Sequence, residues 1–163
     1  MKKAILTAIF IIINTVSINA LDFMDYIASY FNYSYSKEFG GNDIRSDSIG
    51  LELLFEDDAL HCFGSNLKFS GSNTTIRLHY LIMPVLGDWS ADDVFFGLSF
   101  GVGTNISFNM SKNVFGIGPQ INMEILLILI FKISVTYRYN IYFTADNTSE
   151  FELTIGIMNL LIR

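Results

Sequence analysis

The sequence predicts an all-β protein, a closed up-and-down barrel of about eight antiparallel strands, and three observations lead to this fold class. Apolar and polar residues alternate with period two through much of the chain, and a strand places such residues on opposite faces. One of the two faces carries small residues, amides and ions of both signs. Of the 163 residues, 51% are hydrophobic, 15% aromatic and only 16% charged, against roughly 25% charged residues in an average soluble domain.

The alternation is clearest from Phe131 to Ile141, where every odd position is apolar or aromatic and every even position is polar. A helix cannot separate these two classes, because successive side chains point all round its axis. The same pattern predicts further strands over Ser48–Glu56, Cys62–Ser70, Thr75–Ile82, Val94–Val102, Val114–Glu124 and Phe151–Ile157, and a less regular first strand over Tyr26–Ser36. Strands of roughly ten residues are long enough to cross a bilayer when tilted.

The first twenty residues have the three-part form of a secretory signal. Lys2 and Lys3 precede an apolar run from Ala4 to Ile13, and small and polar residues follow up to Ala20. The apolar run is shorter than the roughly 20 residues that span a bilayer. We therefore expect residues 1–20 to be removed as a signal peptide and residues 21–163 to form the barrel domain, with a retained signal anchor as the alternative. No later segment is long and apolar enough for a transmembrane helix.

The residues on the polar face distinguish a membrane barrel from a soluble one. In a soluble lipocalin-like barrel the apolar face points inward, whereas here the polar face is mostly small or uncharged and its few ions have both signs. An eight-stranded lumen is just wide enough for side chains to fill, and ions there need partners. The sequence therefore predicts a transmembrane barrel with a lumenal charge network of Glu52, Glu56, Lys68, Arg77, Glu124, Lys132, Arg138 and Glu152. A soluble sheet with a solvated charged face is the alternative.

Turn symmetry predicts particular contacts within this network. A turn centred midway between Glu124 and Lys132 places these two residues directly opposite each other, as a cross-strand ion pair. A symmetric hairpin loop places Lys68 opposite Arg77, and like charges in that position are destabilising unless a carboxylate lies between them. Glu52 is the candidate for that carboxylate.

Polar segments connect the expected strands at alternate ends of the barrel. They are Lys37–Ser46, Ser70–Asn73, Ile106–Asn113 and Thr144–Ser149. If both termini are periplasmic, these are the external loops. The remaining turns, including a longer one over Pro84–Asp93, are then periplasmic.

Four internal segments and the closing strand resemble a known group of proteins. They are His79–Pro84, Phe96–Gly103, Phe115–Gly118 ahead of Glu124, Tyr137–Tyr139 and Phe151–Ile162. They are similar to the small bacterial outer-membrane β-barrel families, which include the outer-membrane protein X, opacity and porin-like barrel domains. The resemblance covers most of the chain after the signal and implies a barrel in the bacterial outer membrane, with lipid as its partner and no particular activity. Such barrels usually finish on an aromatic residue, whereas this chain finishes Leu160–Arg163.

The sequence predicts no catalytic site, metal site or cofactor. We expect His79 on the inner face and His61 on the opposite face, so the two histidines form neither a catalytic pair nor a metal site. The acidic pairs Asp57–Asp58 and Asp92–Asp93 are more typical of solvated turns than of cation sites. Cys62 is the one cysteine of the chain, so an intramolecular disulfide is impossible.

Together these features predict an outer-membrane protein with a structural or surface-interaction role and no enzymatic activity. Its exposed loops, Lys37–Ser46 and Ile106–Asn113, are the expected contact sites for an extracellular or host ligand. The alternatives are a narrow porin-like channel, against which a charge-filled lumen counts, and a secreted soluble barrel that binds an apolar ligand. The formal net charge of −6 excludes the basic face that nucleic acid requires. We expect a monomer surrounded by outer-membrane lipid.

Overall fold

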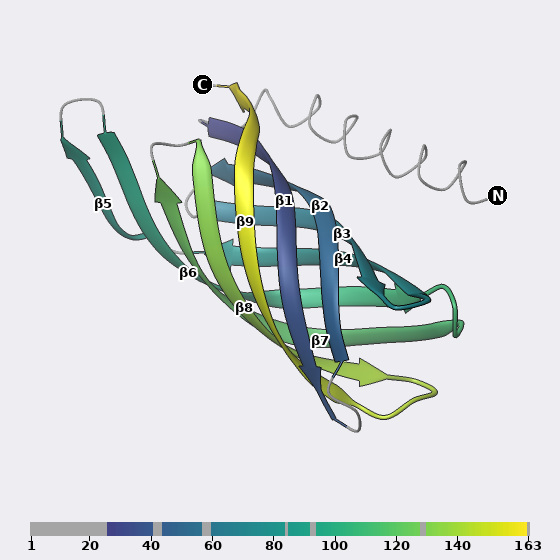
Figure 1. Ribbon diagram of the computed structural model, residues 1–163. Helices are drawn as coiled ribbons and strands as arrows, with labels where there is room; N and C mark the ends of the chain where they lie inside the picture. Colours follow the sequence, from purple (N-terminus) through teal and green to yellow (C-terminus); the bar gives the residue numbers. More distant parts are fainter. Residues whose placement is uncertain are drawn as a thin grey trace.

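The computed structural model describes residues 26–40, 44–56, 60–83, 85–91, 94–127 and 130–162, which form one antiparallel sheet closed into a barrel (Figure 1). The strands are β1 (Tyr26–Phe39), β2 (Ile44–Glu56), β3 (Leu60–Ser70), β4 (Asn73–Met83), β5 (Val85–Ala91), β6 (Val94–Asn109), β7 (Val114–Leu127), β8 (Phe131–Tyr142) and β9 (Thr148–Ile162). Their order in the sheet is β4-β3-β2-β1-β9-β8-β7-β6-β5, and a further pairing of β4 with β6 closes the barrel. The predicted fold class is confirmed. The expected signal peptide, residues 1–20, lies outside the described residues.

Strands β4 and β5 are consecutive parts of one strand of the barrel wall. Ile82 of β4 pairs with Val102 of β6, and Val85 of β5 pairs with Ser99 of the same strand, so the register continues across position 84. The wall therefore has the expected eight strands. Because β4 and β5 pair with successive parts of β6, β5 stands beside one end of β6 in Figure 1. The expected periplasmic loop over Pro84–Asp93 is wrong, because Val85–Ala91 form a strand.

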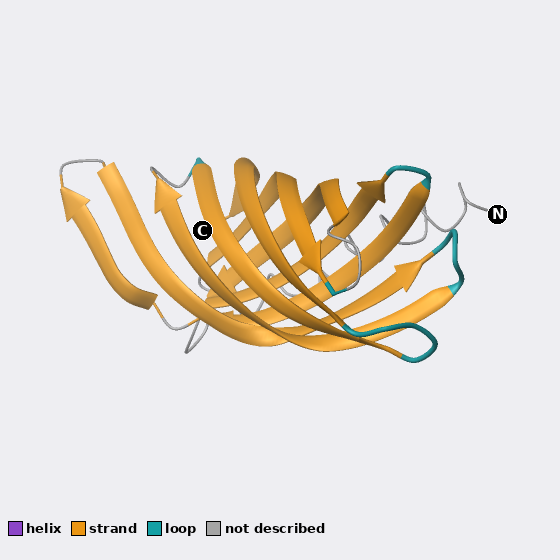
Figure 2. Cartoon of the chain, turned by 60° about the horizontal axis from the view of Figure 1, so that its bottom comes forward, coloured by secondary structure: helices purple, strands orange, loops and turns teal. Residues whose placement is uncertain are grey.

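The strands also extend further toward the external loops than the alternation predicts. Lys37 pairs with Arg45, and Asn109 pairs with Val114. Strands therefore include Lys37–Phe39 and Ile44–Ser46 of the first expected loop, and Ile106–Asn109, which is half of the second. Backbone hydrogen bonds continue the sheet even where apolar side chains become fewer, because the ladder does not depend on side-chain polarity. We call the end of the barrel where short connections follow β1, β3, β6 and β8 the loop end, and the opposite end the termini end (Figure 2).

Inward and outward residues are sorted as the alternation predicts. On β8, Val135 faces outward with 40% of its surface exposed, and the adjacent Thr136 faces the lumen with 4% exposed. The same alternation of exposed and buried residues runs along β7. Apolar side chains thus cover the outside and polar side chains fill the inside, which is the reverse of the arrangement in a soluble barrel. None of the described segments is a helix that is long and apolar enough to cross a membrane.

The lumen has two chemically different parts. Toward the termini end it holds an apolar cluster of Ala28, Tyr30, Leu54, Cys62, Leu81, Met83 and Leu126, all buried. Toward the loop end it holds ions and amides. The sequence contains a signal for the apolar cluster, because segments such as Leu53–Phe55 and Leu81–Met83 are apolar at both odd and even positions. Alternation weakens there because both faces of the strand are in apolar surroundings.

Candidate functional site: the lumenal charge network

A continuous chain of ion pairs fills the lumen toward the loop end. Its nitrogen–oxygen distances are 3.0 Å for Glu38–Lys68, 3.0 Å for Lys68–Glu150, 2.5 Å for Glu150–Arg77, 3.2 Å for Arg77–Glu152 and 2.8 Å for Glu152–Arg138. We call these six residues the loop-end ion chain. Its three carboxylates and three cations balance in charge, as buried ions require.

The loop-end ion chain crosses the inside of the barrel. Arg77 extends from β4, whereas Glu150 and Glu152 both lie on β9. In the sheet, β4 and β9 are separated by β3, β2 and β1, so these contacts run through the lumen and not along the wall. The two carboxylates share one face of β9 because they are two residues apart. Arg77 binds both with one guanidinium group, a planar fork of donors that suits two acceptors at once.

Deeper in the lumen, a second group of charged residues lies next to the apolar cluster. His79 Nε2 lies 3.0 Å from Glu52 Oε1, and Lys132 Nζ contacts Glu52 Oε2 and, at 3.2 Å, Glu124 Oε2. Lys132 also lies over the ring of Tyr30, 5.5 Å from its centroid. We call Glu52, His79, Glu124 and Lys132 the mid-lumen cluster. These residues come from β2, β4, β7 and β8, so this cluster too spans the lumen.

The structure brings together seven of the eight residues of the predicted charge network. Buried lumenal ion pairs involve Glu52, Lys68, Arg77, Glu124, Lys132, Arg138 and Glu152. The side chain of Glu56 lies outside the described part of the chain.

The predicted contact between Glu124 and Lys132 is present, but its geometry differs from the prediction. Glu124 pairs in register with Ser134, and Lys132 pairs with Leu126. The hairpin is centred at position 129, one residue later than expected, and this shifts the register by two. The ion pair is therefore diagonal, and the long Lys132 side chain spans the offset.

The predicted arrangement of Lys68, Arg77 and Glu52 is wrong in two respects. Lys68 pairs in register with Thr75 and not with Arg77. The carboxylate between the two cations is that of Glu150, which contacts both. Glu52 instead belongs to the mid-lumen cluster. The sequence pattern could not select the right carboxylate, because Glu150 approaches from the opposite wall of the barrel.

Two residues of the loop-end ion chain are missing from the predicted network. Glu38 falls inside an expected loop, and Glu150 falls just before the expected start of the last strand. Glu150 has the same parity as Glu152, so extending that strand by one residue would have identified it. His79 lies in the lumen as expected, whereas His61 faces away from it, with Nδ1 2.7 Å from the Tyr80 hydroxyl.

No family model and no curated protein sequence matches this chain. Its structure is similar to that of Neisserial surface protein A, with a TM-score of 0.57 and 13% identity over 82% of this chain and 94% of the other. A de novo designed transmembrane β-barrel matches with a TM-score of 0.51 and 8% identity over 81% and 95% of the two chains. The outer-membrane enzyme PagL matches with a TM-score of 0.50 and 10% identity over 77% and 98%.

The fold is that of the small bacterial outer-membrane β-barrels. The structural similarity establishes this shared architecture, and identities of only 8–13% mean that it establishes nothing finer. The similar structures include a surface protein, an enzyme and a designed barrel, so the fold alone does not select an activity. The function of this barrel therefore depends on its own side chains.

Proposed function

We propose that this protein is a non-enzymatic, non-conducting β-barrel of a bacterial outer membrane, with a structural or surface-interaction role at its loop end. The observation that carries this proposal is the combination of an apolar outer face with a lumen filled by paired ions. The outer face determines the environment of the barrel, and the filled lumen argues against transport.

The outer face is suited to lipid along the described strands. Large hydrophobic side chains with 38–55% of their surface exposed include Phe31, Ile49, Val102, Met123, Ile133, Leu153 and Ile157. These side chains come from six strands of the wall, whereas soluble monomers rarely expose contiguous apolar patches larger than a few hundred Å². An outward apolar band is typical of transmembrane barrels, and the similar solved structures support the same location.

The lumen is too well filled to favour a pore. Arg77, Lys132 and Arg138 each have no more than 2% of their surface exposed, and the ion pairs of Arg77 with Glu152 and of Lys132 with Glu52 connect strands that are not neighbours in the sheet. A water-filled channel would leave such ions solvated. The porin-like alternative is therefore less consistent with the side chains than a closed barrel.

Planar-bilayer recordings test this conclusion. The purified barrel should give no reproducible single-channel steps, and a porin inserted under the same conditions provides the positive control. The double variant Arg77→Ala with Arg138→Ala removes two side chains that fill the lumen, so it should conduct more than the unaltered protein. Regular steps from the unaltered barrel would contradict the proposal and favour the narrow pore.

The loop end offers short, exposed connections to an external partner. Phe143 has 68% of its surface exposed, and Ser111, Lys112 and Asn113 are exposed in the connection between β6 and β7. We place the surface-interaction role at these tips. Among the described residues, Ser111, Lys112 and Asn113 are the tip of the predicted loop Ile106–Asn113, whose first half belongs to β6.

Protease accessibility on intact cells tests the location and the orientation together. A cleavage site inserted at Lys112 or at Asn147 should be cut by added protease, because both positions lie at the loop end. The same site inserted directly after Glu56, at the termini end, should be protected until the cells are opened. Equal cutting at all three positions would contradict the orientation, and recovery of the barrel in the soluble fraction would contradict the membrane location.

A further inference from the structure

Three neighbouring strands place a carboxylate and an imidazole on either side of a glycine. Glu52 of β2 pairs with Gly64 of β3, and Gly64 pairs with His79 of β4. Because Gly64 has no side chain, Glu52 and His79 meet above it, with Oε1 and Nε2 3.0 Å apart. A Cβ atom on Gly64 would overlap the His79 ring and would lie 2.6 Å from Glu52 Cγ. The contact between Glu52 and His79 therefore depends on glycine at this position.

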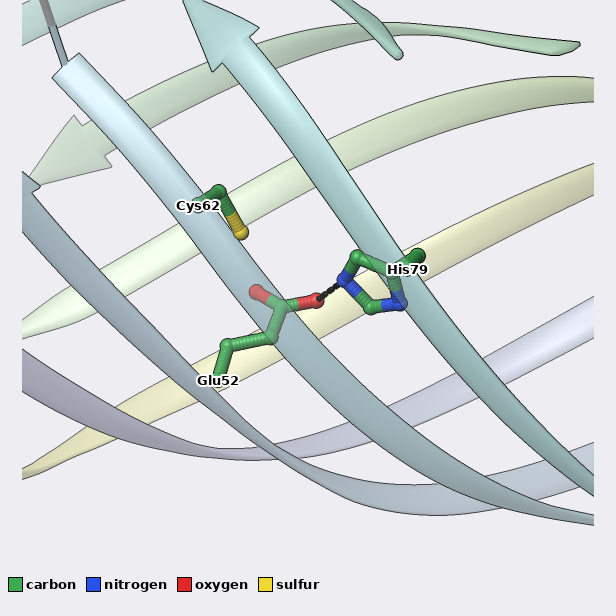
Figure 3. Close-up of side chains that lie close together, drawn as sticks. All are labelled: Glu52, Cys62 and His79. Carbon is green, nitrogen blue, oxygen red and sulfur yellow. Dashed lines mark ion pairs between the residues drawn. The ribbon is translucent and has the colours of Figure 1, made fainter. Parts of the chain in front are cut away.

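Cys62 completes a group of three different ligand types. It lies two residues before Gly64 on β3, so its side chain faces the same side of the strand. Its Sγ, a carboxylate oxygen of Glu52 and a ring nitrogen of His79 all lie within 4.8 Å of one another. Figure 3 shows the three side chains converging, with the sulfur directed toward the other two. Cys62, Glu52 and His79 are buried, with 1%, 7% and 3% of their surfaces exposed.

Thiolate, imidazole and carboxylate groups together are typical ligands of zinc. Metal–ligand bonds of about 2.0–2.3 Å in a tetrahedral site separate the ligand atoms by roughly 3.3–3.6 Å. The 3.0 Å between Glu52 and His79 is close to this range. The sulfur lies no more than 4.8 Å from the other two ligand atoms. A shift of at most about 1.5 Å would therefore bring it to a tetrahedral ligand–ligand separation. Three protein ligands leave a fourth coordination position.

The charge balance of the lumen also favours a cation at this place. The loop-end ion chain is neutral by itself. The mid-lumen cluster has two carboxylates, Glu52 and Glu124, for the single ammonium of Lys132, when His79 is neutral. A divalent cation bound with a Cys62 thiolate would cancel this excess and leave the cluster neutral. A buried net charge is costly, so a bound cation would stabilise the barrel.

The protein also leaves hydrogen-bonding capacity unused beside this group. Glu124 Oε1 and His79 Nδ1 are buried and have no partner among the described residues. Lys132 contacts Glu52 through Oε2 and leaves Oε1 facing His79. Glu52 can therefore bind a metal ion through Oε1 while Lys132 fixes the orientation of its carboxylate. Such supporting contacts orient metal ligands in many proteins.

We propose that Glu52, Cys62 and His79 form a binding site for a divalent transition-metal ion of the zinc type, which links β2, β3 and β4 inside the lumen. On binding, the Cys62 thiol releases one proton to solvent and its thiolate bonds to the ion. His79 binds as a neutral imidazole through Nε2, and Glu52 binds through Oε1. No group is oxidised or reduced. This site is independent of the surface role proposed above. The expectation of no metal site considered the two histidines and the acidic pairs, but not Glu52 and Cys62 together with His79.

Cobalt absorption spectroscopy tests the site. The tag-free barrel is refolded in detergent with Co²⁺, and unbound ion is removed. We expect one Co²⁺ per folded chain, with the visible bands of a tetrahedral site and a near-ultraviolet band from sulfur-to-cobalt charge transfer. Zn²⁺ should displace Co²⁺ and remove these bands, because zinc binds such sites more tightly.

Four variants distinguish this site from adventitious binding. Cys62→Ser should remove the charge-transfer band, and both Cys62→Ser and His79→Gln should weaken binding by at least about tenfold. Gly64→Ala should also weaken it, because the added methyl group displaces His79. His61→Gln is the matched control, since His61 faces away from the lumen, and it should bind as the unaltered protein does. Heat-modifiable migration on gels verifies that each variant is folded.

Two results would overturn the proposal. If the folded, unaltered barrel binds no Co²⁺, these three residues do not form a metal site. If folded Cys62→Ser binds Co²⁺ with the same affinity and spectrum, the ion binds elsewhere. Neither result changes the bilayer or protease outcomes expected for a closed outer-membrane barrel, so the two proposals fail separately.

Discussion

The loop end and the termini end of the lumen are filled by opposite chemistries. At the loop end, Arg77 and Glu150 join opposite walls through ion pairs, whereas at the termini end Leu54 and Met83 pack in an apolar cluster. The first kind of filling depends on which atoms meet, because a buried ion without a partner is costly. The second depends mainly on volume, because apolar contacts are not directional. The comparison shows that one closed barrel can be filled in either way.

The boundary between the two parts coincides with the proposed metal site. Cys62 belongs to the apolar cluster, yet its sulfur lies close to Glu52 and His79 of the mid-lumen cluster. A soft ligand at the edge of an apolar region is partly shielded from water. The boundary between the two ends thus brings a thiol, an imidazole and a carboxylate within 4.8 Å of one another.

The largest difference between the two ends should appear when Glu150 is replaced. Glu150→Gln leaves Lys68 with one carboxylate partner and Arg77 with one, so the free energy of unfolding should fall by about 3–5 kcal/mol. Denaturant titration of the refolded barrel in micelles measures this change. Adding Arg77→Met to Glu150→Gln should recover part of the loss, because it removes one of the weakened cations. A loss below about 1 kcal/mol for the single change would mean that water reaches the chain, as at exposed ion pairs.

Shortening a side chain at the termini end should have the next largest effect. Leu54→Ala removes a completely buried side chain and should lower the free energy of unfolding by about 2–5 kcal/mol through lost burial and a cavity. Leu153→Ala is the matched control, because Leu153 faces outward with 48% of its surface exposed. Detergent or lipid fills the space that it leaves, so its loss should be smaller. Equal losses measured in the same titration would show that the apolar cluster is loosely packed.

The smallest of the three effects should be the coupling at the boundary between the two ends. Glu124→Gln removes one partner of Lys132, whereas Lys132→Met removes the cation shared by Glu52 and Glu124. Lys132→Met should therefore destabilise the barrel more. In a double-mutant cycle on the free energy of unfolding, the two changes should couple by about 0.5–3 kcal/mol. Additive effects would show that the diagonal contact contributes nothing.

Much of the fold could be predicted because period-two alternation is a local property of a strand. It placed Val135 on the outside and Thr136 on the inside, as the structure shows. The prediction was least accurate where both faces of a strand have similar surroundings. Near the loop end the strands continue beyond the alternation, and near the termini end Leu53–Phe55 is apolar on both faces. In both places the polarity of a side chain no longer indicates whether it faces the lumen or the outside.

Within the segments that alternate, the sequence by itself determined which residues face the lumen, because the parity of a strand assigns each of its residues to one face. It could not determine which lumenal residues meet. The contacts of Arg77 with Glu150 and Glu152 join strands that are separated by three others in the sheet. The meeting of Glu52, Cys62 and His79 requires the register of three strands at once. These contacts depend on turn centres, strand tilt and closure of the wall, which are properties of the whole barrel.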